Sequence, residues 1–232
     1  MPFFRKRRAQ LPDDPGDIEL IEAITNHCES FLGPVEEVLH EVKSPFVHMD
    51  LLRFKGDPDD PFHLFVTCGM SSKPMNVPAN VMDRDHYRYA ELLLCLPSDW
   101  PVEWEQLADP ANWWPLQKLK ILARMPHEAE TWVWFGHTFA HTSPPSPFAP
   151  DTELCAALVC PNALFPKEFE FLTYKGRTIV FQQLAFLYRE EYQYTKANYG
   201  KGFLKLVRES GMPPDEFFVL NKHRRNLCKD LS

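Results

Sequence analysis

Apolar side chains recur every three or four residues near the start of the chain, as they do on one face of a helix. The positions are Ile18, Ile21, Ile24, Cys28 and Phe31. Asp14-Pro15 precedes this stretch, and proline favours the first turn of a helix. Gly33-Pro34 follows it, as expected where a helix ends. We therefore predict one amphipathic helix between these two dipeptides.

Short apolar runs between clusters of turn residues indicate strands in the rest of the chain. The runs cover residues 35–42, 46–54, 62–67, 87–96 and 154–159. The run at 87–96 begins by alternating and ends continuously apolar, which favours a central strand covered on both faces. Two further runs, 169–174 and 178–186, predict a hairpin that turns through Lys175-Gly176-Arg177.

Helical spacing returns in three further places. Residues 102–107 predict a short helix, and Pro115 opens a longer one that Pro126 should stop. The core stripe of the longer helix is Leu116, Leu119, Leu122 and Met125. A last helix over 188–210 should break near Gly200 and Gly202. Between these helices, the prolines in 141–150 exclude a helix or a central strand.

The order helix, strands, helices, strands, helix predicts an α+β fold. We expect a mixed, largely antiparallel central sheet flanked by helices in a single layer-type domain. That domain should span 14–212, between a flexible N-terminal tail at 1–13 and a C-terminal extension at 213–232.

Charge and composition narrow the class of partner. Apolar residues make up 44% of the chain, which is enough for a sizeable core. The net charge is −7, and short basic segments near both ends leave the remainder more acidic still. Such a chain repels nucleic acid and favours a basic protein partner. It shows neither a membrane-spanning apolar stretch nor an apolar segment behind its basic N-terminus, so we expect a cytoplasmic protein without membrane association.

Metal chemistry finds weak support in the sequence. His127-Glu128 begins like a zinc-protease helix motif, but Thr131 stands where the second histidine is required. His137 and His141 have a spacing that could begin a metal site. The cysteines that follow them, at 155 and 160, would point to opposite faces of a strand and could not easily complete it. We therefore expect no metal and no cofactor.

Nucleophilic chemistry is also weakly supported. Cys68, beside Gly69 at the end of a predicted strand, is the best candidate nucleophile, yet it lacks the local signature of a papain-like or caspase-like enzyme. Four of the six cysteines lie within apolar runs, where thiols behave as small buried hydrophobes. We expect these cysteines to be reduced.

His48 and Asp50 form a third candidate. Two residues apart on a strand, they share a face and could form a hydrogen-bonded pair. Such a pair can serve acid–base chemistry, but it more often fixes a neighbouring loop. The aromatic residues are similarly ambiguous, because they serve both cores and protein interfaces; they are Trp113, Trp114, Trp132, Trp134 and Phe135.

Several separate motifs, in order along residues 17–210, resemble the suppressor of fused family. They are His48-Met49-Asp50, the run Thr67-Cys68-Gly69-Met70-Ser71-Ser72-Lys73-Pro74-Met75, Ala90-Glu91-Leu92 with Leu96-Pro97, Trp114-Pro115-Leu116, Pro126-His127-Glu128, Trp132, Gly136-His137-Thr138, and Leu187-Tyr188-Arg189-Glu190-Glu191. The resemblance implies a non-catalytic protein-binding domain. Its animal members restrain a transcription factor and carry a second, C-terminal lobe, whereas this chain is similar to the stand-alone bacterial type.

The resemblance also implies a mechanism, which is stoichiometric inhibition. A protein of this type would act as an immunity protein, blocking a toxin domain, and the acidic chain suits a basic, nuclease-like toxin. The methionines of the 67–75 run should present an adaptable binding surface. The residues expected to bind the partner are His48, Asp50, Met70, Ser71, Pro74, Met75, His127, Trp132 and His137.

Two alternatives stay open at this point. One is a regulatory module that binds a small molecule or a metal. The other is an undescribed hydrolase, which would require His48, Asp50, His127 and His137 to converge in one cleft.

Overall fold

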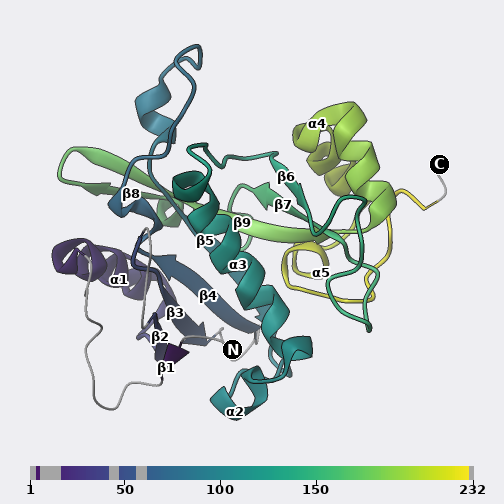
Figure 1. The fold of residues 1–232 in the computed structure, drawn as a ribbon, viewed down its shortest axis with the longest axis horizontal. Helices are drawn as coiled ribbons and strands as arrows, with labels where there is room; N and C mark the ends of the chain where they lie inside the picture. Colours follow the sequence, from purple (N-terminus) through teal and green to yellow (C-terminus); the bar gives the residue numbers. More distant parts are fainter. Residues whose placement is uncertain (1–3, 6–16, 42–46, 56–61, 230–232) are drawn as a thin grey trace.

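The computed structural model describes residues 4–5, 17–41, 47–55 and 62–229, and its centre is a mixed β-sheet (Figure 1). The strands are β1 (Phe4–Arg5), β2 (Glu37–Glu41), β3 (Asp50–Lys55), β4 (Phe62–Cys68), β5 (Ala90–Pro97), β6 (Thr138–Ala140), β7 (Ala156–Cys160), β8 (Phe171–Tyr174) and β9 (Arg177–Leu187). Their order is β1-β2-β3-β4-β5-β9-β7-β6, and β8 also pairs with β9. β5 and β9 are parallel, whereas the other described pairs are antiparallel, so the predicted sheet is confirmed.

Helices cover both faces of this sheet. They are α1 (Ile18–Leu32), α2 (Trp104–Leu107), α3 (Pro110–Glu128), α4 (Arg189–Glu209) and α5 (Pro214–Phe218), with short 3-10 turns η1 (Met70–Ser72), η2 (Arg84–Tyr87) and η3 (Lys167–Glu170). α1 packs on β3 and β4 at one face, and α3 packs on β4 and β5 at the other. α4 lies beside β6 and β7 at the far end of the sheet (Figure 1).

Strand β5 separates two apolar cores. Leu92, Leu94 and Leu96 join the core beneath α3, while Leu93 and Cys95 join the core beneath α1. The apolar residues of this stretch are each at most 1% exposed. This confirms the prediction of a central strand, since alternate side chains of a strand point to opposite faces.

The sequence predicted α1 and the short helix α2 well but misplaced both ends of α3. The side chain of Asp17 caps α1 by accepting a hydrogen bond from the Leu20 N–H at 3.1 Å. α3 begins at Pro110, after the cap residue Asp109, and continues through both Pro115 and Pro126. Each proline removes one backbone hydrogen bond. The burial of the α3 stripe against the sheet outweighs that loss.

The predicted break in α4 is confirmed, and its cause lies in a neighbouring element. Tyr199 adopts φ 58° and ψ 162°, which is not helical. The next residue, Gly200, lies against the turn before β6, where a Cβ atom would come within 2.3 Å of the Gly136 carbonyl oxygen. α4 can therefore approach β6 only with a glycine at this position.

The segment predicted as a C-terminal extension packs into the domain. Val219 bridges to Cys95 where β5 and β9 diverge, and the Leu220 N–H donates to the Cys95 carbonyl at 2.9 Å. Phe217 and Phe218, in α5, join the core beneath α4. The sequence pattern did not predict α5 or the edge strand β6. Of the predicted tail 1–13, β1 is described and pairs with β2, while the rest lies outside the described residues.

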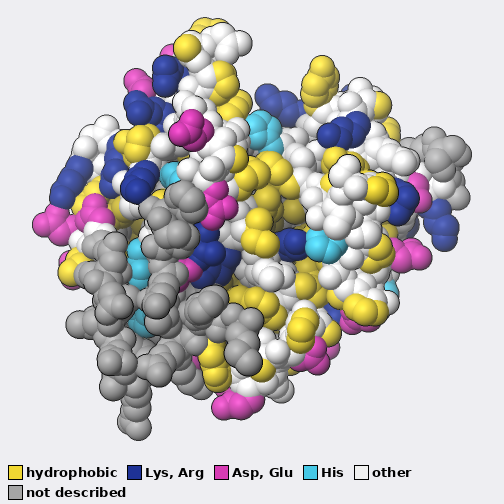
Figure 2. Space-filling view, viewed as in Figure 1, with side chains coloured by type: hydrophobic (Ala, Val, Ile, Leu, Met, Phe, Trp, Pro, Cys, Tyr) yellow, Lys and Arg dark blue, Asp and Glu magenta, His cyan; other side chains and the backbone are white. Residues whose placement is uncertain are grey.

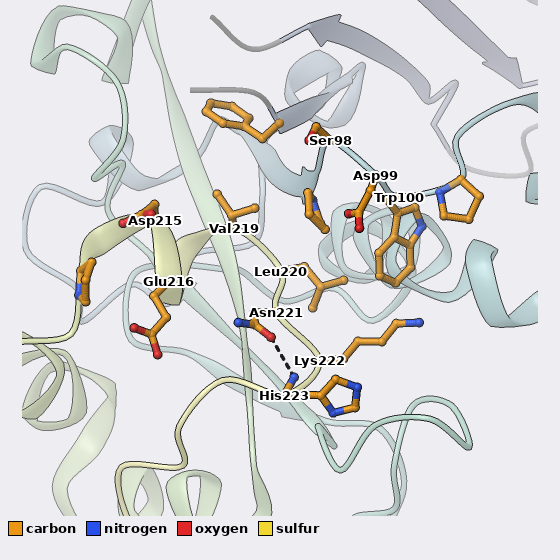
Figure 3. Close-up of a pocket in the computed structure, with 14 residues that line it drawn as sticks. Ser98, Asp99, Trp100, Asp215, Glu216, Val219, Leu220, Asn221, Lys222 and His223 are labelled. Carbon is orange, nitrogen blue, oxygen red and sulfur yellow. Dashed lines mark hydrogen bonds between the residues drawn. The ribbon is translucent and has the colours of Figure 1, made fainter. Parts of the chain in front are cut away.

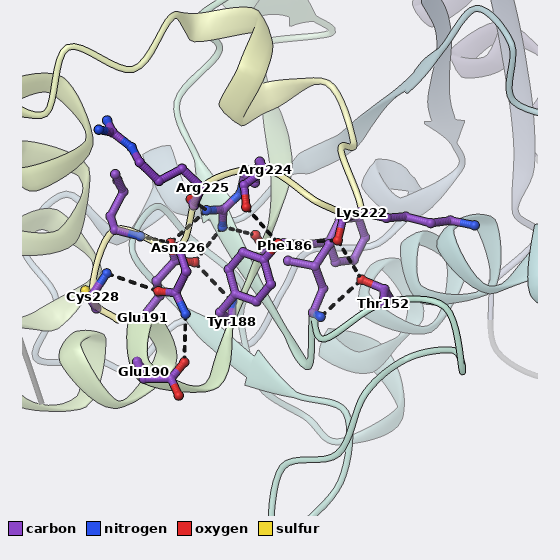
Figure 4. Close-up of polar contacts among 12 residues, drawn as sticks. Thr152, Phe186, Tyr188, Glu190, Glu191, Lys222, Arg224, Arg225, Asn226 and Cys228 are labelled. Carbon is purple, nitrogen blue, oxygen red and sulfur yellow. Dashed lines mark hydrogen bonds and ion pairs between the residues drawn. The ribbon is translucent and has the colours of Figure 1, made fainter. Parts of the chain in front are cut away.

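A buried ion pair fastens this C-terminal segment to α4 (Figure 4). Both guanidinium nitrogens of Arg224 contact the Glu191 carboxylate, at 2.5 and 2.7 Å, and both side chains are at most 2% exposed. Arg224 also donates to the Phe186 carbonyl at 2.6 Å. The Tyr188 hydroxyl donates to the Arg224 carbonyl at 2.8 Å. This network holds 222–228 in place. Tyr188 and Glu191 belong to the Leu187–Glu191 motif, whereas no motif includes Arg224.

Candidate protein-binding surface

The 67–75 run is anchored by a buried carboxylate, Glu91 of β5. Glu91 accepts hydrogen bonds from the hydroxyls of Thr67 at 2.6 Å and Ser71 at 2.7 Å. It also accepts hydrogen bonds from the backbone N–H groups of Gly69, Met70 and Ser71, at 3.1, 3.3 and 2.9 Å. Burial raises the pKa of Glu91, and these hydrogen bonds oppose that effect. The polar residues of the motif thus fold the loop inward.

The expectation that this loop presents its methionines to a partner is wrong. Met70 and Ser71 are fully buried, and Met75 is 2% exposed. Both methionines belong to the core beneath α3. The Glu91 anchor turns η1 into the protein, so the flexible side chains fill interior space instead of covering the surface. Pro74, in contrast, is exposed.

The second motif packs directly on the first. His127 Nε2 lies 2.9 Å from the Met70 carbonyl oxygen, and the Asn76 N–H donates to the Thr131 carbonyl at 3.0 Å. Asn76 also donates from its side chain to the Glu130 carbonyl at 2.9 Å. Two segments that lie far apart in the sequence therefore form one unit. Its outer side is a shallow cavity of about 500 Å³, lined by Lys73, Pro74, Asn76, Pro126, His127 and Glu130.

His48 and Asp50 do lie together, inside a buried polar cluster. His48 Nε2 is 3.1 Å from one Asp50 oxygen, and His40 Nδ1 is 2.8 Å from the other. Asp50 also accepts the Glu41 N–H at 2.9 Å. Lys120 of α3 contacts Glu41 at 3.2 Å, and burial lowers the pKa of Lys120 to about 7. This cluster ties α3 to β2 and β3, which is a structural role.

The contacts of the four candidate hydrolase residues keep them in separate surroundings. His127 contacts the Met70 carbonyl, whereas His137 accepts the Trp134 N–H at 3.3 Å. His48 and Asp50 are at most 8% exposed. Burial also raises the pKa of the Cys68 thiol well above its ordinary value, which disfavours a nucleophilic thiolate. These surroundings offer no nucleophile beside a base.

Metal ligation finds no support in the part of the chain that the structure describes. Within it, no group of three or more His, Cys, Asp or Glu side chains could hold an ion. The six cysteines are all buried and free of disulfides. No helix of the described ranges is long and apolar enough to cross a membrane.

Half-buried aromatic side chains form a continuous surface, which we call the aromatic surface. Its members are Tyr87, Trp132, Trp134, Phe135, His137 and Phe139. Ring centroids lie 4.5 Å apart for Tyr87 and Trp134, 4.8 Å for Trp132 and His137, and 4.9 Å for Trp134 and Phe135. Figure 2 shows apolar side chains gathered in the middle of this face of the molecule.

The aromatic surface runs onto β6, the last strand of the sheet. β6 pairs with β7 on one side, and its three residues are all half-buried. No other described strand pairs with β6, so β6 forms an edge of the sheet, and α4 packs beside it. Of the residues predicted to bind a partner, Trp132 and His137 belong to this surface. Sequence reasoning left Trp134 and Phe135 ambiguous and missed Tyr87 and Phe139.

A larger cavity, of about 790 Å³, lies elsewhere, between the end of β5 and the C-terminal segment (Figure 3). Trp100, Asp99, Asp215, Glu216 and Lys222 contribute to its wall. The Lys222 ammonium forms an ion pair with the Asp151 carboxylate at 2.5 Å and lies 4.3 Å from the Trp100 ring centroid. Of the motif residues Pro97 lines this cavity, whereas the 67–75 run and Pro126-His127-Glu128 do not. The carboxylates of Asp99, Asp215 and Glu216 make the wall of this cavity acidic.

The family model described as Suppressor of fused protein (SUFU) matches residues 46–225, which is most of the chain. Among curated proteins, none matches.

Solved structures share the fold at low sequence identity. The crystal structure of the Sufu–Fu complex has a TM-score of 0.61 at 16% identity, covering 90% of this chain and 92% of that one. A SUFU homologue from Neisseria gonorrhoeae FA 1090 has a TM-score of 0.63 at 12% identity, covering 90% and 97%. Drosophila Suppressor of Fused has a TM-score of 0.58 at 16% identity, and the match covers 94% of this chain but 52% of that longer one.

Proposed function

We propose, from the premise that this chain belongs to the suppressor of fused family, that it works by binding another protein without catalysis. A similar fold occurs in the crystal structure of a complex between two proteins, Sufu and Fu. The observation that carries the proposal is the aromatic surface beside β6. Aromatic side chains are the usual anchors of protein interfaces, and this chain holds six of them in contact and half-exposed.

The partner is proposed to add an extended segment along β6. Backbone hydrogen bonds from an edge strand supply affinity, while neighbouring pockets select the side chains of the added segment. The rings of Trp132 and His137 lie 4.8 Å apart, and His137 directly precedes β6. Pro74 and His127, at the shallow cavity, are proposed to extend the contact.

The finer proposal concerns the kind of partner. The net charge of −7 favours association with a basic protein, because complementary charge speeds the encounter. A stoichiometric inhibitor, such as an immunity protein that covers a basic toxin or nuclease domain, would work in this way. Complex formation would then depend on salt, with affinity falling as ionic strength rises.

Affinity capture from the cells that make the protein tests both levels of the proposal. The tagged chain, the variant Phe135→Glu and the control Ile18→Glu are captured at low and moderate salt, and co-purifying proteins are identified by mass spectrometry. Ile18 is an exposed apolar residue of α1, on another part of the molecule. We expect a stoichiometric partner with the wild type and the control, and its loss with Phe135→Glu.

Circular dichroism confirms that each variant is folded before capture. A partner that Phe135→Glu retains would place the interface elsewhere. A wild-type chain that captures nothing at either salt concentration would contradict the binding function itself. A partner that is acidic and insensitive to salt would contradict only the toxin or nuclease proposal.

A further inference from the structure

The cavity of about 790 Å³ between the end of β5 and the C-terminal segment is lined by both apolar and acidic side chains (Figure 3). Phe62 and Leu220 are 8% and 5% exposed, so they form an enclosed apolar part of the lining. Asp99 and Asp215 are exposed, and Glu216 is half-buried. In Figure 3 Leu220 lies between Asp99 on one side and the two carboxylates of α5 on the other. The cavity therefore offers apolar contact and negative charge to the same ligand, and solvent reaches its carboxylates.

The residues that the structure describes do not neutralise these three carboxylates. Within the described ranges, none of the three forms an ion pair. Lys222 also lines the cavity, but its ammonium is paired with Asp151, a carboxylate outside the lining. With His223 neutral, the lining carries three negative charges against one positive charge. A cavity lined mainly by one sign of charge attracts a ligand of the opposite sign.

One end of the cavity already holds a cation, which the chain itself supplies. The Lys222 ammonium lies 4.3 Å from the centroid of the Trp100 ring, and both residues line the cavity. A cation over an aromatic face is attracted by the ring electrons. The Lys222 carbonyl accepts hydrogen bonds from the hydroxyls of Thr152 at 3.2 Å and Tyr188 at 3.3 Å, which fix its backbone. The lining thus accommodates one cation beside Trp100 and leaves its own three carboxylates to a second one.

The walls of the cavity are held in place before any ligand arrives. Pro97 and Pro101 line it on the β5 side, and Pro213 lines it on the side of α5. Proline fixes its own backbone φ angle. The Leu220 N–H donates to the Cys95 carbonyl at 2.9 Å, which attaches one wall to the other. A ligand that enters a rigid cavity has little ordering of the protein to offset.

The arrangement of charge favours an elongated organic cation over a metal ion. In the described part of the chain, no group of three or more His, Cys, Asp or Glu side chains could hold a metal ion. Arginine and lysine combine a long apolar stem with a cationic end. The stem can pack on Val219 and Leu220 while the cationic end reaches a carboxylate. The net charge of −7 favours a protein partner that is rich in such side chains.

We infer that this cavity receives an arginine or lysine side chain of the protein partner, held between Leu220 and the carboxylates of Asp99, Asp215 and Glu216. The inference rests on the proposed function, because it assigns a place on this chain to the positive charge of a basic partner. It adds a contact separate from the aromatic surface, since no member of that surface lines the cavity.

Peptide selection tests the inference without knowledge of the partner. Phage displaying random twelve-residue peptides are selected against the immobilised full chain, and affinities are measured by calorimetry. Asp215→Asn with Glu216→Gln is the cavity variant. Glu22→Gln with Glu168→Gln is the matched control, because it removes two exposed carboxylates from α1 and η3. We expect peptides with a shared Arg or Lys, whose affinity falls about tenfold with the cavity variant and less than twofold with the control.

Exchanging the shared basic residue of the peptide separates a local contact from the overall charge. The exchange to glutamine should weaken binding about tenfold to the wild type but less than twofold to the cavity variant. Asp99→Asn, on the opposite wall, should also reduce the effect of the exchange. Circular dichroism confirms that each variant is folded before its affinity is measured.

Three results would overturn the inference. The first is an equal loss from the glutamine exchange in the wild type and the cavity variant. The second is spermidine binding as tightly as the peptide, which would assign the cavity to a free polyamine. The third is a set of peptides that Phe135→Glu abolishes and the cavity variant leaves unchanged, which would keep the proposed binding function intact. Peptides that respond to neither variant would contradict that function as well.

Discussion

Arg224→Met is expected to destabilise the protein severely, although Arg224 lies in the segment that the sequence pattern treats as an extension. Methionine keeps much of the length of the side chain and can occupy the same space, so the substitution removes mainly the charge and the donors. The guanidinium contacts Glu191 with two nitrogens and donates to the carbonyls of Phe186 and Arg225 (Figure 4). All of these contacts lie in surroundings that exclude water.

The magnitude follows from what remains after the substitution. Glu191 is 0% exposed, and without Arg224 its carboxylate would retain only the backbone N–H groups of Tyr188 and Leu227, at 3.0 Å each. Breaking one side of a buried ion pair costs about 3–5 kcal/mol, because a charge is left without compensation. With a urea dependence of about 2–3 kcal/mol/M for a domain of this size, the midpoint should fall by roughly 1–2.5 M.

The assay is equilibrium unfolding in urea at neutral pH, followed by both circular dichroism and tryptophan fluorescence. Arg225→Met is the matched control, because Arg225 is the next residue and has an exposed guanidinium that donates to Ser210 at 3.2 Å. We expect the control to lose less than about 1 kcal/mol. The double variant Glu191→Gln with Arg224→Met should recover part of the loss, since it removes both charges.

Equal midpoints for Arg224→Met and Arg225→Met would refute this reasoning. They would mean that the C-terminal segment detaches without affecting the rest of the domain. A double variant that is less stable than Arg224→Met would show that the Glu191 hydrogen bonds to the backbone matter more than its charge. A preserved midpoint after truncation at residue 212 would contradict the packing of the segment altogether.

Three further predictions concern the positions that hold the binding surface. Glu91→Ala leaves five buried donors without an acceptor and should lower the free energy of unfolding by about 3–5 kcal/mol in urea, against almost no change for the exposed Glu168→Ala. Gly200→Ala should lower the melting temperature in calorimetry by several degrees or more, because the added Cβ would lie 2.3 Å from the Gly136 carbonyl oxygen. Gly202→Ala is the control, since its added Cβ would lie 3.0 Å from a side-chain atom of Asn198, and it should be tolerated. Burial lowers the pKa of His127 below its ordinary value of 6.5, so on acidification the unfolded chain takes up this proton before the folded chain does. The free energy of unfolding should therefore fall as the pH drops below that value. The urea midpoint of His127→Gln should fall less between pH 7.5 and 5.5 than that of the wild type, and an identical pH dependence would contradict the assignment.

Secondary structure and family membership could largely be predicted from the sequence. The spacing of Ile21, Ile24 and Cys28 predicts α1, and the continuous apolar run at 87–96 predicts a strand buried on both sides. Both signals are local, because they depend on the periodicity of one segment. The proline rule failed in α3, where the burial of a whole helix face outweighs two missing hydrogen bonds. The strand β6 was missed because it is three residues long and has little pattern of its own.

The roles of the motif residues required the tertiary structure. The sequence predicted that His48 and Asp50 lie together, and their side chains are 3.1 Å apart, but His48 precedes β3 and does not share a strand face with Asp50. It could not show that Met70 and Met75 point inward, because that depends on Glu91, which lies about twenty residues away in another strand. The same holds for the aromatic surface, which joins Tyr87 to Trp134 across the fold.

What the sequence determined by itself was therefore most of the longer elements, the mixed sheet and the family. What only the tertiary structure decided was exposure: which motif residues support the fold, which aromatic side chains reach the surface, and how residues 213–229 complete the core. Periodicity reports which face of an element is apolar. Whether that face meets the core, another segment or a partner depends on contacts between residues distant in the chain, and a single sequence does not encode those contacts as a local pattern.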